Sequence, residues 1–292
     1  MNGLLDRRSF LKAGAAGAAV CLSGLEVPCL AADAPKGTPN AAKLDWRVVC
    51  CTYTFRQFTF LEAAERAAGL GLTEMEAFAW QALSKDDPKA KADASLSADL
   101  RKDTKKRLDD IGVKWTGLYL GGAPSRRTFD FAKEMGIEIL VAEPPVSVLE
   151  AVDKLCEEYK ISVAIHNHPK PSSQYWDPQT VVEACKDRSK YMGCCGDTGH
   201  WCRSGVNPVE AVKALEGRMI SFHLKDVVKF GGPSGDCPWG TGQGDIAGIL
   251  KEVHRQKAKA VFGIEYEKGG DIMADLRQSI AYLEKVAGNL AG

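Results

Sequence analysis

Short apolar runs with strand character alternate strictly with amphipathic helical segments from Arg47 to the end of the chain. Strict strand–helix alternation implies parallel pairing of the strands. Eight such units in about 245 residues match the size of a closed (β/α)8 barrel. The predicted fold class is therefore α/β, a single-domain barrel over 46–292. Its strands are predicted at 48–53, 72–78, 113–120, 137–142, 161–165, 191–195, 219–224 and 260–264.

An open, doubly wound sheet is the alternative arrangement for such a pattern. Folds of that kind that bind nucleotides carry a glycine-rich phosphate loop after the first strand. Here the residues after the first predicted strand, Cys51-Thr52-Tyr53-Thr54-Phe55, contain no glycine. The closed barrel is therefore favoured.

The charge balance gives no sign of a nucleic-acid or lipid partner. The 292 residues contain 38 Lys and Arg and 38 Asp and Glu, so the formal net charge is zero. Proteins that bind the phosphate backbone usually carry a clear excess of positive charge. We expect a small-molecule partner and no nucleic acid.

The N-terminus has the pattern of a twin-arginine export signal. Arg7-Arg8 precedes an Ala- and Gly-rich apolar run, and small residues at 30–32 offer a cleavage site. We predict a signal peptide at 1–32, a polar linker at 33–45, and a periplasmic or otherwise exported enzyme. An amphipathic N-terminal helix is the alternative. The apolar run is too short to span a bilayer, so no membrane contact is expected after cleavage. Because phosphorylated sugars are scarce outside the cytoplasm, an unphosphorylated substrate is expected.

Ten cysteines are many for this length, and Cys21 and Cys29 would leave with the signal. Pairs at 50–51 and 194–195 lie in predicted strands, where cysteine usually serves as a small apolar residue. The sequence contains no Cys-x-x-Cys pair, so a structural zinc site is not expected. If an exported protein of this sequence holds a disulfide, Cys202 with Cys237 is the predicted pair.

Four of the predicted strands end in residue types that bind metals or move protons. The carboxyl ends of barrel strands face one common mouth, where catalysis is expected. Each residue also has a structural alternative: Asp197 could cap a helix, His223 could be a core histidine, and Lys225 could pair with Asp226. In chain order, the strand-end residues are His166 and His168, Asp197 and His200, His223 and Lys225, and Glu265.

These motifs carry a family resemblance. They are Asp197-Thr198-Gly199-His200, His223-Leu224-Lys225-Asp226, a glycine-rich loop at 240–246 and Glu265 after the last strand, with a weaker match at 74–78. In this order they resemble the xylose-isomerase-like TIM barrel superfamily, also known as sugar phosphate isomerases/epimerases. The resemblance implies one divalent metal ion held by Asp197, His223, Glu265 and a residue of the fifth strand.

The fifth-strand position departs from the family pattern. Members similar to this chain usually have Glu there, whereas this chain has His166. Either His166 takes the position, or Glu143 at the end of the fourth strand replaces it. A site with two imidazoles suits Mn²⁺, Co²⁺, Zn²⁺ or Fe²⁺ better than Mg²⁺.

The resemblance implies a metal-dependent isomerase or epimerase acting through an enediolate on an unphosphorylated keto-sugar or keto-glycoside. Glu265 would take the proton, and Lys225 or His200 would serve as the partner acid. The candidate substrate contacts are Glu76, His168, Trp201 and Arg203.

Three alternatives stay open or are weighed at this point. The missing fifth-strand carboxylate removes one base of a two-base epimerase and leaves room for a lyase or hydratase acting on 3-keto-glycosides. An exported sugar-binding barrel without catalysis is a further alternative. An abasic-site endonuclease of the same barrel is disfavoured, because it needs early histidines and none precedes His166.

Three tryptophans near the mouth could stack on sugar rings or cover a partner's site in a homodimer. They are Trp176, Trp201 and Trp239.

Overall fold

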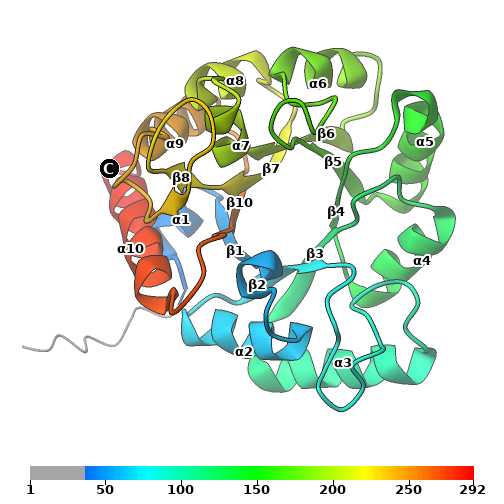
Figure 1. Ribbon diagram of the computed structural model, residues 1–292. Helices are drawn as coiled ribbons and strands as arrows, with labels where there is room; N and C mark the ends of the chain where they lie inside the picture. The colour runs from blue at the N-terminus through cyan, green and yellow to red at the C-terminus, as the bar shows by residue number, and fades with distance from the viewer. Residues whose placement is uncertain (1–36) are drawn as a thin grey trace, which may run out of the picture. The chain divides into compact units, whose positions relative to one another are not determined.

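The computed structural model describes residues 37–292, and the predicted signal peptide at 1–32 lies outside them. Eight parallel strands close into a barrel, each pairing with its neighbours in chain order and the last with the first (Figure 1). The predicted (β/α)8 barrel is thus confirmed. The barrel strands are β1 (Arg47–Cys51), β2 (Glu74–Phe78), β3 (Lys114–Tyr119), β4 (Ile139–Ala142), β5 (Ser162–His166), β6 (Met192–Asp197), β7 (Met219–Leu224) and β10 (Val261–Ile264).

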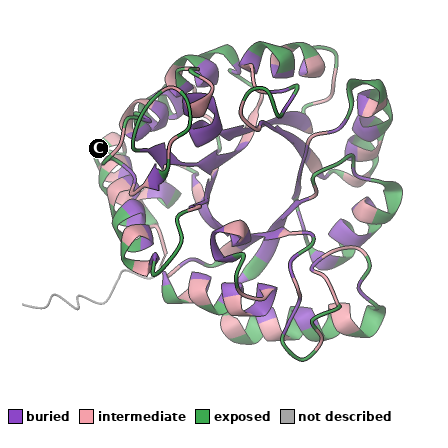
Figure 2. Cartoon of the chain, in the orientation of Figure 1, coloured by how far each residue is buried: buried purple, intermediate pink, exposed green. Residues whose placement is uncertain are grey.

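Helices surround the barrel and bury one face against it. Figure 2 shows buried strands within a ring of helices whose outer faces are exposed. The helices that follow the eight strands are α2 (Phe60–Gly69), α3 (Ala98–Ile111), α4 (Arg126–Met135), α5 (Leu149–Tyr159), α6 (Pro178–Cys185), α8 (Pro208–Ala214), α9 (Ile246–Arg255) and α10 (Met273–Leu290). Short 3-10 turns precede α2 and α5, at η1 (Thr52–Phe55) and η2 (Val146–Val148). None of the helices within 37–292 has the length and apolar character that a membrane crossing requires.

The first strand is shorter than predicted. It ends at Cys51, and the predicted strand residues Thr52 and Tyr53 belong to η1. The Thr54 hydroxyl donates to the Ile264 carbonyl at 3.1 Å and accepts from the Tyr266 amide at 3.0 Å. These bonds tie the turn to the end of β10 and replace further strand pairing.

Part of the predicted linker is packed. Residues 39–43 form helix α1 (Pro39–Lys43), which begins with Pro at its first position. Its Ala41 is fully buried, and the Glu284 carboxylate of α10 accepts the backbone amides of Asn40 and Ala41, both at 2.9 Å. Residues 37–45 are therefore part of the barrel body and no free connector.

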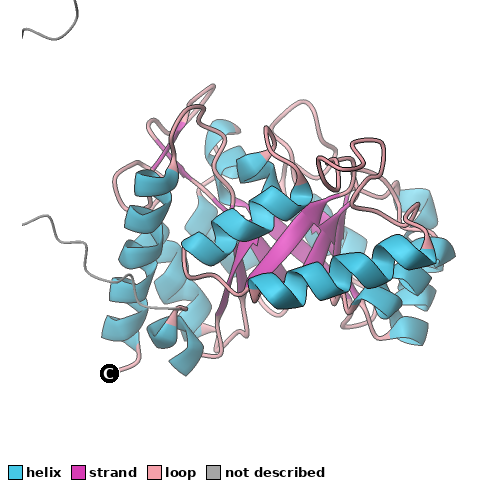
Figure 3. Cartoon of the chain, turned by 90° about the horizontal axis from the view of Figure 1, so that it is seen from below, coloured by secondary structure: helices cyan, strands magenta, loops and turns pink. Residues whose placement is uncertain are grey.

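Two further elements that the sequence pattern did not predict follow β6 and β7. Helix α7 (Thr198–Arg203) follows β6 directly, and the loop after β7 contains a hairpin of β8 (Asp226–Val227) and β9 (Asp236–Cys237). In Figure 3 the hairpin stands above one end of the barrel. The Asp226 carboxylate fastens the glycine-rich part of this loop by accepting the amides of Gly240, Gly242 and Gly244 at 2.8 to 3.0 Å.

The cysteines of the described chain are all free thiols. The predicted Cys202–Cys237 bridge is therefore absent. Cys194 packs in the core between barrel and helices, and Cys195 packs inside the barrel beside Val141 and Ala164. Both act as small apolar residues, as the sequence indicated.

Candidate active site

A cavity of about 290 Å³ opens at the carboxyl ends of the barrel strands. The residues at the four predicted strand ends either line this cavity or form the buried charged groups next to it. Asp197 and Lys225 are fully buried and do not line its surface. The lining residues are Cys51, Tyr53, Phe78, Trp80, Tyr119, His166, His168, His200, His223, Glu265 and Glu267.

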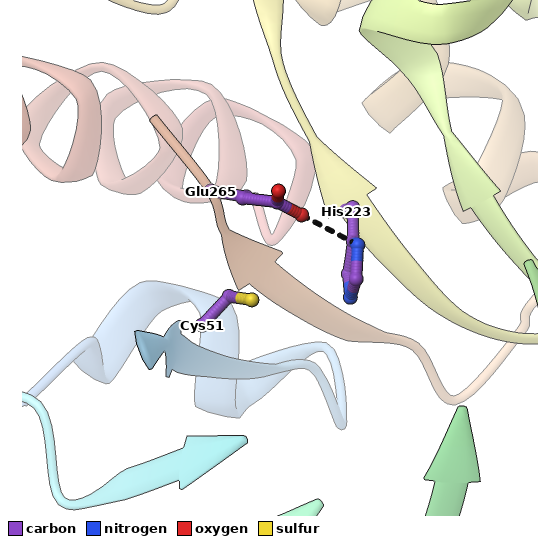
Figure 4. Close-up of side chains that lie close together, drawn as sticks. All are labelled: Cys51, His223 and Glu265. Carbon is purple, nitrogen blue, oxygen red and sulfur yellow. Dashed lines mark ion pairs between the residues drawn. The ribbon is translucent and has the colours of Figure 1, made fainter. Parts of the chain in front are cut away.

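His223 lies between two carboxylates. Its Nε2 is 2.7 Å from Glu76 Oε1, and its Nδ1 is 2.6 Å from Glu265 Oε2. Figure 4 shows His223, Glu265 and Cys51 converging from β7, β10 and β1. Burial opposes a charge on His223, but Glu76 and Glu265 raise its pKa well above the ordinary value. A metal at Nδ1 would displace the proton held there.

Glu76 supports His223 and does not line the cavity. Its side chain is 5% exposed and contacts the histidine nitrogen that faces away from Glu265. The predicted role of Glu76 as a substrate contact is therefore not supported, because its side chain does not reach the cavity. A Cβ on Gly117 would come within 2.9 Å of Glu76 Cγ, so glycine on β3 provides the space that Glu76 occupies.

His166 has a similar arrangement. Its Nδ1 is 3.1 Å from Glu143 Oε1, which leaves Nε2 facing Asp197 Oδ2 at 3.6 Å. Glu143 also contacts His168 Nδ1 and accepts the Ser173 hydroxyl at 2.6 Å. Although burial opposes its ionisation, the hydrogen bonds from His166 and His168 lower the pKa of Glu143 to about 2. Because the oxygens of Glu143 are engaged, His166 fits the fifth-strand ligand position better than Glu143.

Asp197 serves as a helix cap and as a charged site residue together. Its Oδ1 accepts the His200 amide at 2.8 Å, which begins helix α7. Its Oδ2 is 2.9 Å from Lys225 Nζ and 3.4 Å from His200 Nε2. Burial works against ionisation, but His200, Lys225 and His166 hold the pKa of Asp197 well below its usual range.

Lys225 carries a buried charge shared by three carboxylates. Its Nζ lies 2.9 Å from Asp197, 3.1 Å from Glu265 and 2.8 Å from Glu267. Burial opposes the charge, yet these carboxylates raise its pKa well above the ordinary value. Lys225 thus does not pair with Asp226, which holds the loop instead. Gly199 makes room for it, because a Cβ there would meet Lys225 Cβ at 2.8 Å.

Arg203 fixes the orientation and tautomer of His200. One guanidinium nitrogen lies 3.0 Å from His200 Nδ1, and the other contacts Asp236. Since a guanidinium only donates, Nδ1 must accept and the ring proton must lie on Nε2. Burial lowers the pKa of His200 to about 2, so the ring is neutral. His200 therefore presents an N–H toward Asp197.

The residues fit a divalent cation. Asp197 Oδ2, His223 Nδ1 and Glu265 Oε2 are buried and lack an aligned hydrogen bond, although each has a charged neighbour. Both imidazoles are anchored by a carboxylate on their other nitrogen, as metal-ligating histidines commonly are. The four predicted ligands lie in two groups, Cys51–His223–Glu265 and His166–Asp197–His200, and His166 also belongs to a third group with Glu143 and His168. Burial raises the pKa of the Cys51 thiol well above its ordinary value.

An aromatic wall on the cavity was missed by sequence reasoning. The rings of Phe78 and Tyr119 stack with centroids 5.3 Å apart, and Trp80 packs on both while staying 52% exposed. The position of Trp80, two residues beyond β2, was the available signal. By contrast, the predicted substrate contact Trp201 is fully buried against Gly196, and Trp239 is also in the core. Their burial excludes stacking on a sugar.

The remaining predicted contacts lie at two different places. His168 lines the cavity, and Glu267, which sequence reasoning did not single out, lines it beside Glu265. Arg203 lines an adjoining cavity that shares His200 and Glu267 with the first. Trp176 is a lining residue of neither cavity, and its ring lies under the Lys170 ammonium, 4.9 Å from the ring centroid.

A protein-family model described as xylose isomerase-like TIM barrel matches residues 64–286. An uncharacterized protein from Parabacteroides distasonis ATCC 8503 is 31% identical in sequence to this chain. Its crystal structure superposes with a TM-score of 0.68 over 82% of this chain and 99% of that one.

More distant structures share the fold. A D-tagatose 3-epimerase-like protein is 17% identical, with a TM-score of 0.65 over 84% of this chain and 98% of its own. A xylose isomerase-like TIM barrel protein from Mycobacterium smegmatis, in complex with magnesium, is 13% identical, with a TM-score of 0.66 over 85% of this chain and 98% of its own. No protein with a curated description matches the chain.

Proposed function

Because the chain belongs to the xylose isomerase-like TIM barrel family, we propose that it is a divalent-metal-dependent enzyme that enolises a keto-sugar or keto-glycoside. The observation that carries this proposal is the pairing of two carboxylate-anchored histidines with Glu265 at one cavity. Asp197, His223, Glu265 and His166 would hold the ion. Two imidazoles in the set favour Mn²⁺, Co²⁺, Zn²⁺ or Fe²⁺ over Mg²⁺.

Proton transfer falls to residues of the last strand and its neighbour. When bound, a divalent ion would polarise the substrate carbonyl and acidify the adjacent C–H. Glu265 takes that proton, since its carboxylate is ionised and lines the cavity. The Lys225 ammonium, 3.1 Å from Glu265 Oε1, stabilises the negative charge nearby. His200, which like Lys225 lies next to Asp197, is neutral and offers its Nε2–H as a hydrogen-bond donor.

Elimination is the second candidate reaction, and the carboxylate positions favour it. A two-base epimerase needs acid–base groups on opposite faces of the substrate. Here Glu265 and Glu267 both contact the single ammonium of Lys225, so they lie together. In a lyase, Glu265 removes the proton, the electrons form a C=C bond, and the neighbouring C–O bond breaks. The departing oxygen takes a proton from His200, which lines the cavity, and the buried Lys225 ammonium stabilises the adjacent carboxylates from behind the cavity surface.

Deuterium exchange tests the enolisation. The metal-loaded protein in D₂O is offered free ketoses and 3-keto-glycosides, and the products are followed by NMR. We expect deuterium next to the carbonyl and a loss of at least a hundredfold in rate for Glu265→Gln, because removal of a general base typically costs about 10² to 10⁴. Metal content is measured in each variant, and His254→Gln on helix α9 serves as the control. Wild-type exchange in metal-replete Glu265→Gln would sink the proposal.

The same experiment separates the alternatives. Exchange without bond cleavage supports an isomerase or epimerase, and release of an alcohol or water supports a lyase or hydratase. A protein that purifies with metal and binds sugars but gives no exchange would be a non-catalytic binding barrel.

The compartment is part of the proposal. The twin-arginine pattern at Arg7-Arg8 supports export of the folded, metal-loaded protein and an unphosphorylated carbohydrate substrate. A homodimer that covers the mouth remains compatible with the exposed Trp80.

A further inference from the structure

A second cavity, of about 540 Å³, adjoins the one that holds Glu265. The two cavities share His200 and Glu267 as lining residues. We propose that the second cavity binds an uncharged second sugar ring, so that the substrate is a two-ring glycoside. This inference rests on the proposed function for the reacting ring. It adds a binding site and a substrate class that the metal cavity alone does not define.

The size of the two cavities supports a substrate in two parts. The first cavity, at about 290 Å³, is the smaller and is walled by aromatic rings and histidines. A monosaccharide in it would leave the larger second cavity filled with water. Since His200 and Glu267 border both spaces, a glycosidic link beside them would let the second ring extend directly into the larger cavity.

The walls of the second cavity are polar and firmly held. Arg203 Nε donates to the Ser234 carbonyl at 3.0 Å, and the guanidinium also pairs with Asp236. Asp236 in turn accepts the Glu267 amide at 2.7 Å through its other oxygen. These contacts join helix α7, the β8–β9 hairpin and the segment after β10. Such preorganised groups can bond sugar hydroxyls with little ordering cost.

The charges indicate a neutral ligand. Arg203 is neutralised by Asp236, and Lys268 by Asp275 at 3.1 Å. Glu267 adds a carboxylate at the boundary. A phosphate site would need unpaired cationic groups directed into the cavity. Lys170 also lines the cavity and has no carboxylate partner among residues 37–292, but its ammonium lies over the Trp176 ring at 4.9 Å from the centroid. One cation held against an aromatic ring does not make a phosphate site, so the lining favours hydroxyl groups.

Gly235 allows the cavity to be filled without strain. It lines the second cavity, its φ is in the ordinary region, and a Cβ there would meet no atom within 4 Å. Gly122 offers a matched control, since a Cβ there also meets open space and it borders a different hollow near Trp80. Gly235→Trp and Gly122→Trp therefore differ in the space they fill.

Calorimetric binding of unreactive sugars tests the proposal on the whole metal-loaded protein. The probes are methyl glucosides and the disaccharides cellobiose, maltose, trehalose and sucrose. We expect at least one disaccharide to bind tenfold more tightly than the methyl glucosides. This preference should fall to about one in Gly235→Trp and persist in Gly122→Trp. Equal affinities in the wild type, no sugar binding, or a preference that survives Gly235→Trp would overturn the inference.

The same variants separate this inference from the proposed function. In the exchange assay, the ratio of KM for a keto-disaccharide to KM for its one-ring counterpart should rise at least tenfold in Gly235→Trp only. Disaccharide binding that Gly235→Trp removes, in a protein that never exchanges deuterium, would refute enolisation and leave the second-ring site standing. Deuterium exchange with a KM ratio that is unchanged in Gly235→Trp would support enolisation and refute the second-ring site.

Discussion

Two histidines in the cavity each present one nitrogen to the site while a carboxylate holds the other. Glu76 holds His223 from β2, and Glu143 holds His166 from the end of β4. Such partners set the ring orientation and raise the basicity of the ligand. The proposed metal site would therefore depend on residues that do not touch the metal.

Glu76→Gln should weaken metal binding without removing a ligand. It keeps the size of the side chain but removes the charge opposite His223 Nε2. We expect the metal Kd to rise about 10- to 100-fold, the usual effect of losing such a partner. Competition with a chelating dye measures this.

Glu74→Gln is the matched control for that measurement. Glu74 lies on the same strand, but it pairs with Arg47, away from the cavity. Its Kd should equal that of the wild type. A metal affinity in Glu76→Gln indistinguishable from that of Glu74→Gln would show that Glu76 does not support the site.

At this scale the sequence predicted which side chains meet, but not how each one acts. The strand-end positions of His166, His223 and Glu265 follow from the alternation of elements, because all strand ends share one mouth. The role of Glu76 depends on a partner 147 residues away, across the barrel. No spacing in the sequence encodes that distance. Trp201 was misplaced because a six-residue helix, not a loop, carries it into the core.

Among the elements, helix α1 owes its stability to a side chain from the far end of the chain. Thr38 makes no side-chain cap, and the Glu284 carboxylate of α10 accepts the first amides instead. Helix propensity alone identifies only a polar segment that begins with proline here, and it therefore predicts a linker. The tertiary cap explains why the prediction failed.

Glu284→Ala should therefore release α1. Loss of a helix cap costs about 0.5 to 2 kcal/mol. We expect a loss of stability in that range by urea unfolding, with faster hydrogen exchange confined to residues 38–46. Glu158→Ala on α5, which removes an exposed ion pair with Arg126, should leave the stability close to that of the wild type. Unaltered exchange at 38–46 in Glu284→Ala would contradict the capping role.

For the whole molecule, the alternation of segments was sufficient to predict a closed barrel, because eight parallel units of this length have few other ways to bury both faces of the sheet. The hairpin β8–β9 escaped prediction since its strands have two residues each and are held by Asp226 rather than by an apolar pattern. Local periodicity thus predicts the barrel and its helices, whereas long-range polar contacts determine the structure of the loops.

Export of the whole chain can be tested through the arginine pair. Changing Arg7 and Arg8 together to Lys should retain the uncleaved protein in the cytoplasm, because the twin-arginine route reads that pair. Cell fractionation and mass determination of the mature N-terminus, expected near Asp33, provide the measurement. Lys12→Arg, in the same segment, should be exported normally. Equal distribution of all three proteins would rule out this route.

The closure of the barrel has a consequence for its synthesis. Strand β1 pairs with β10, Arg47 lying opposite Val261, and Asn40 bonds Glu284, 244 residues further along. The first strand to leave the ribosome therefore waits for the last, and no shorter nascent chain can complete the sheet. Contacts of such long sequence separation fold slowly. During translation both edges of the growing sheet stay open, which makes this interval the one in which the polypeptide most needs protection by chaperones.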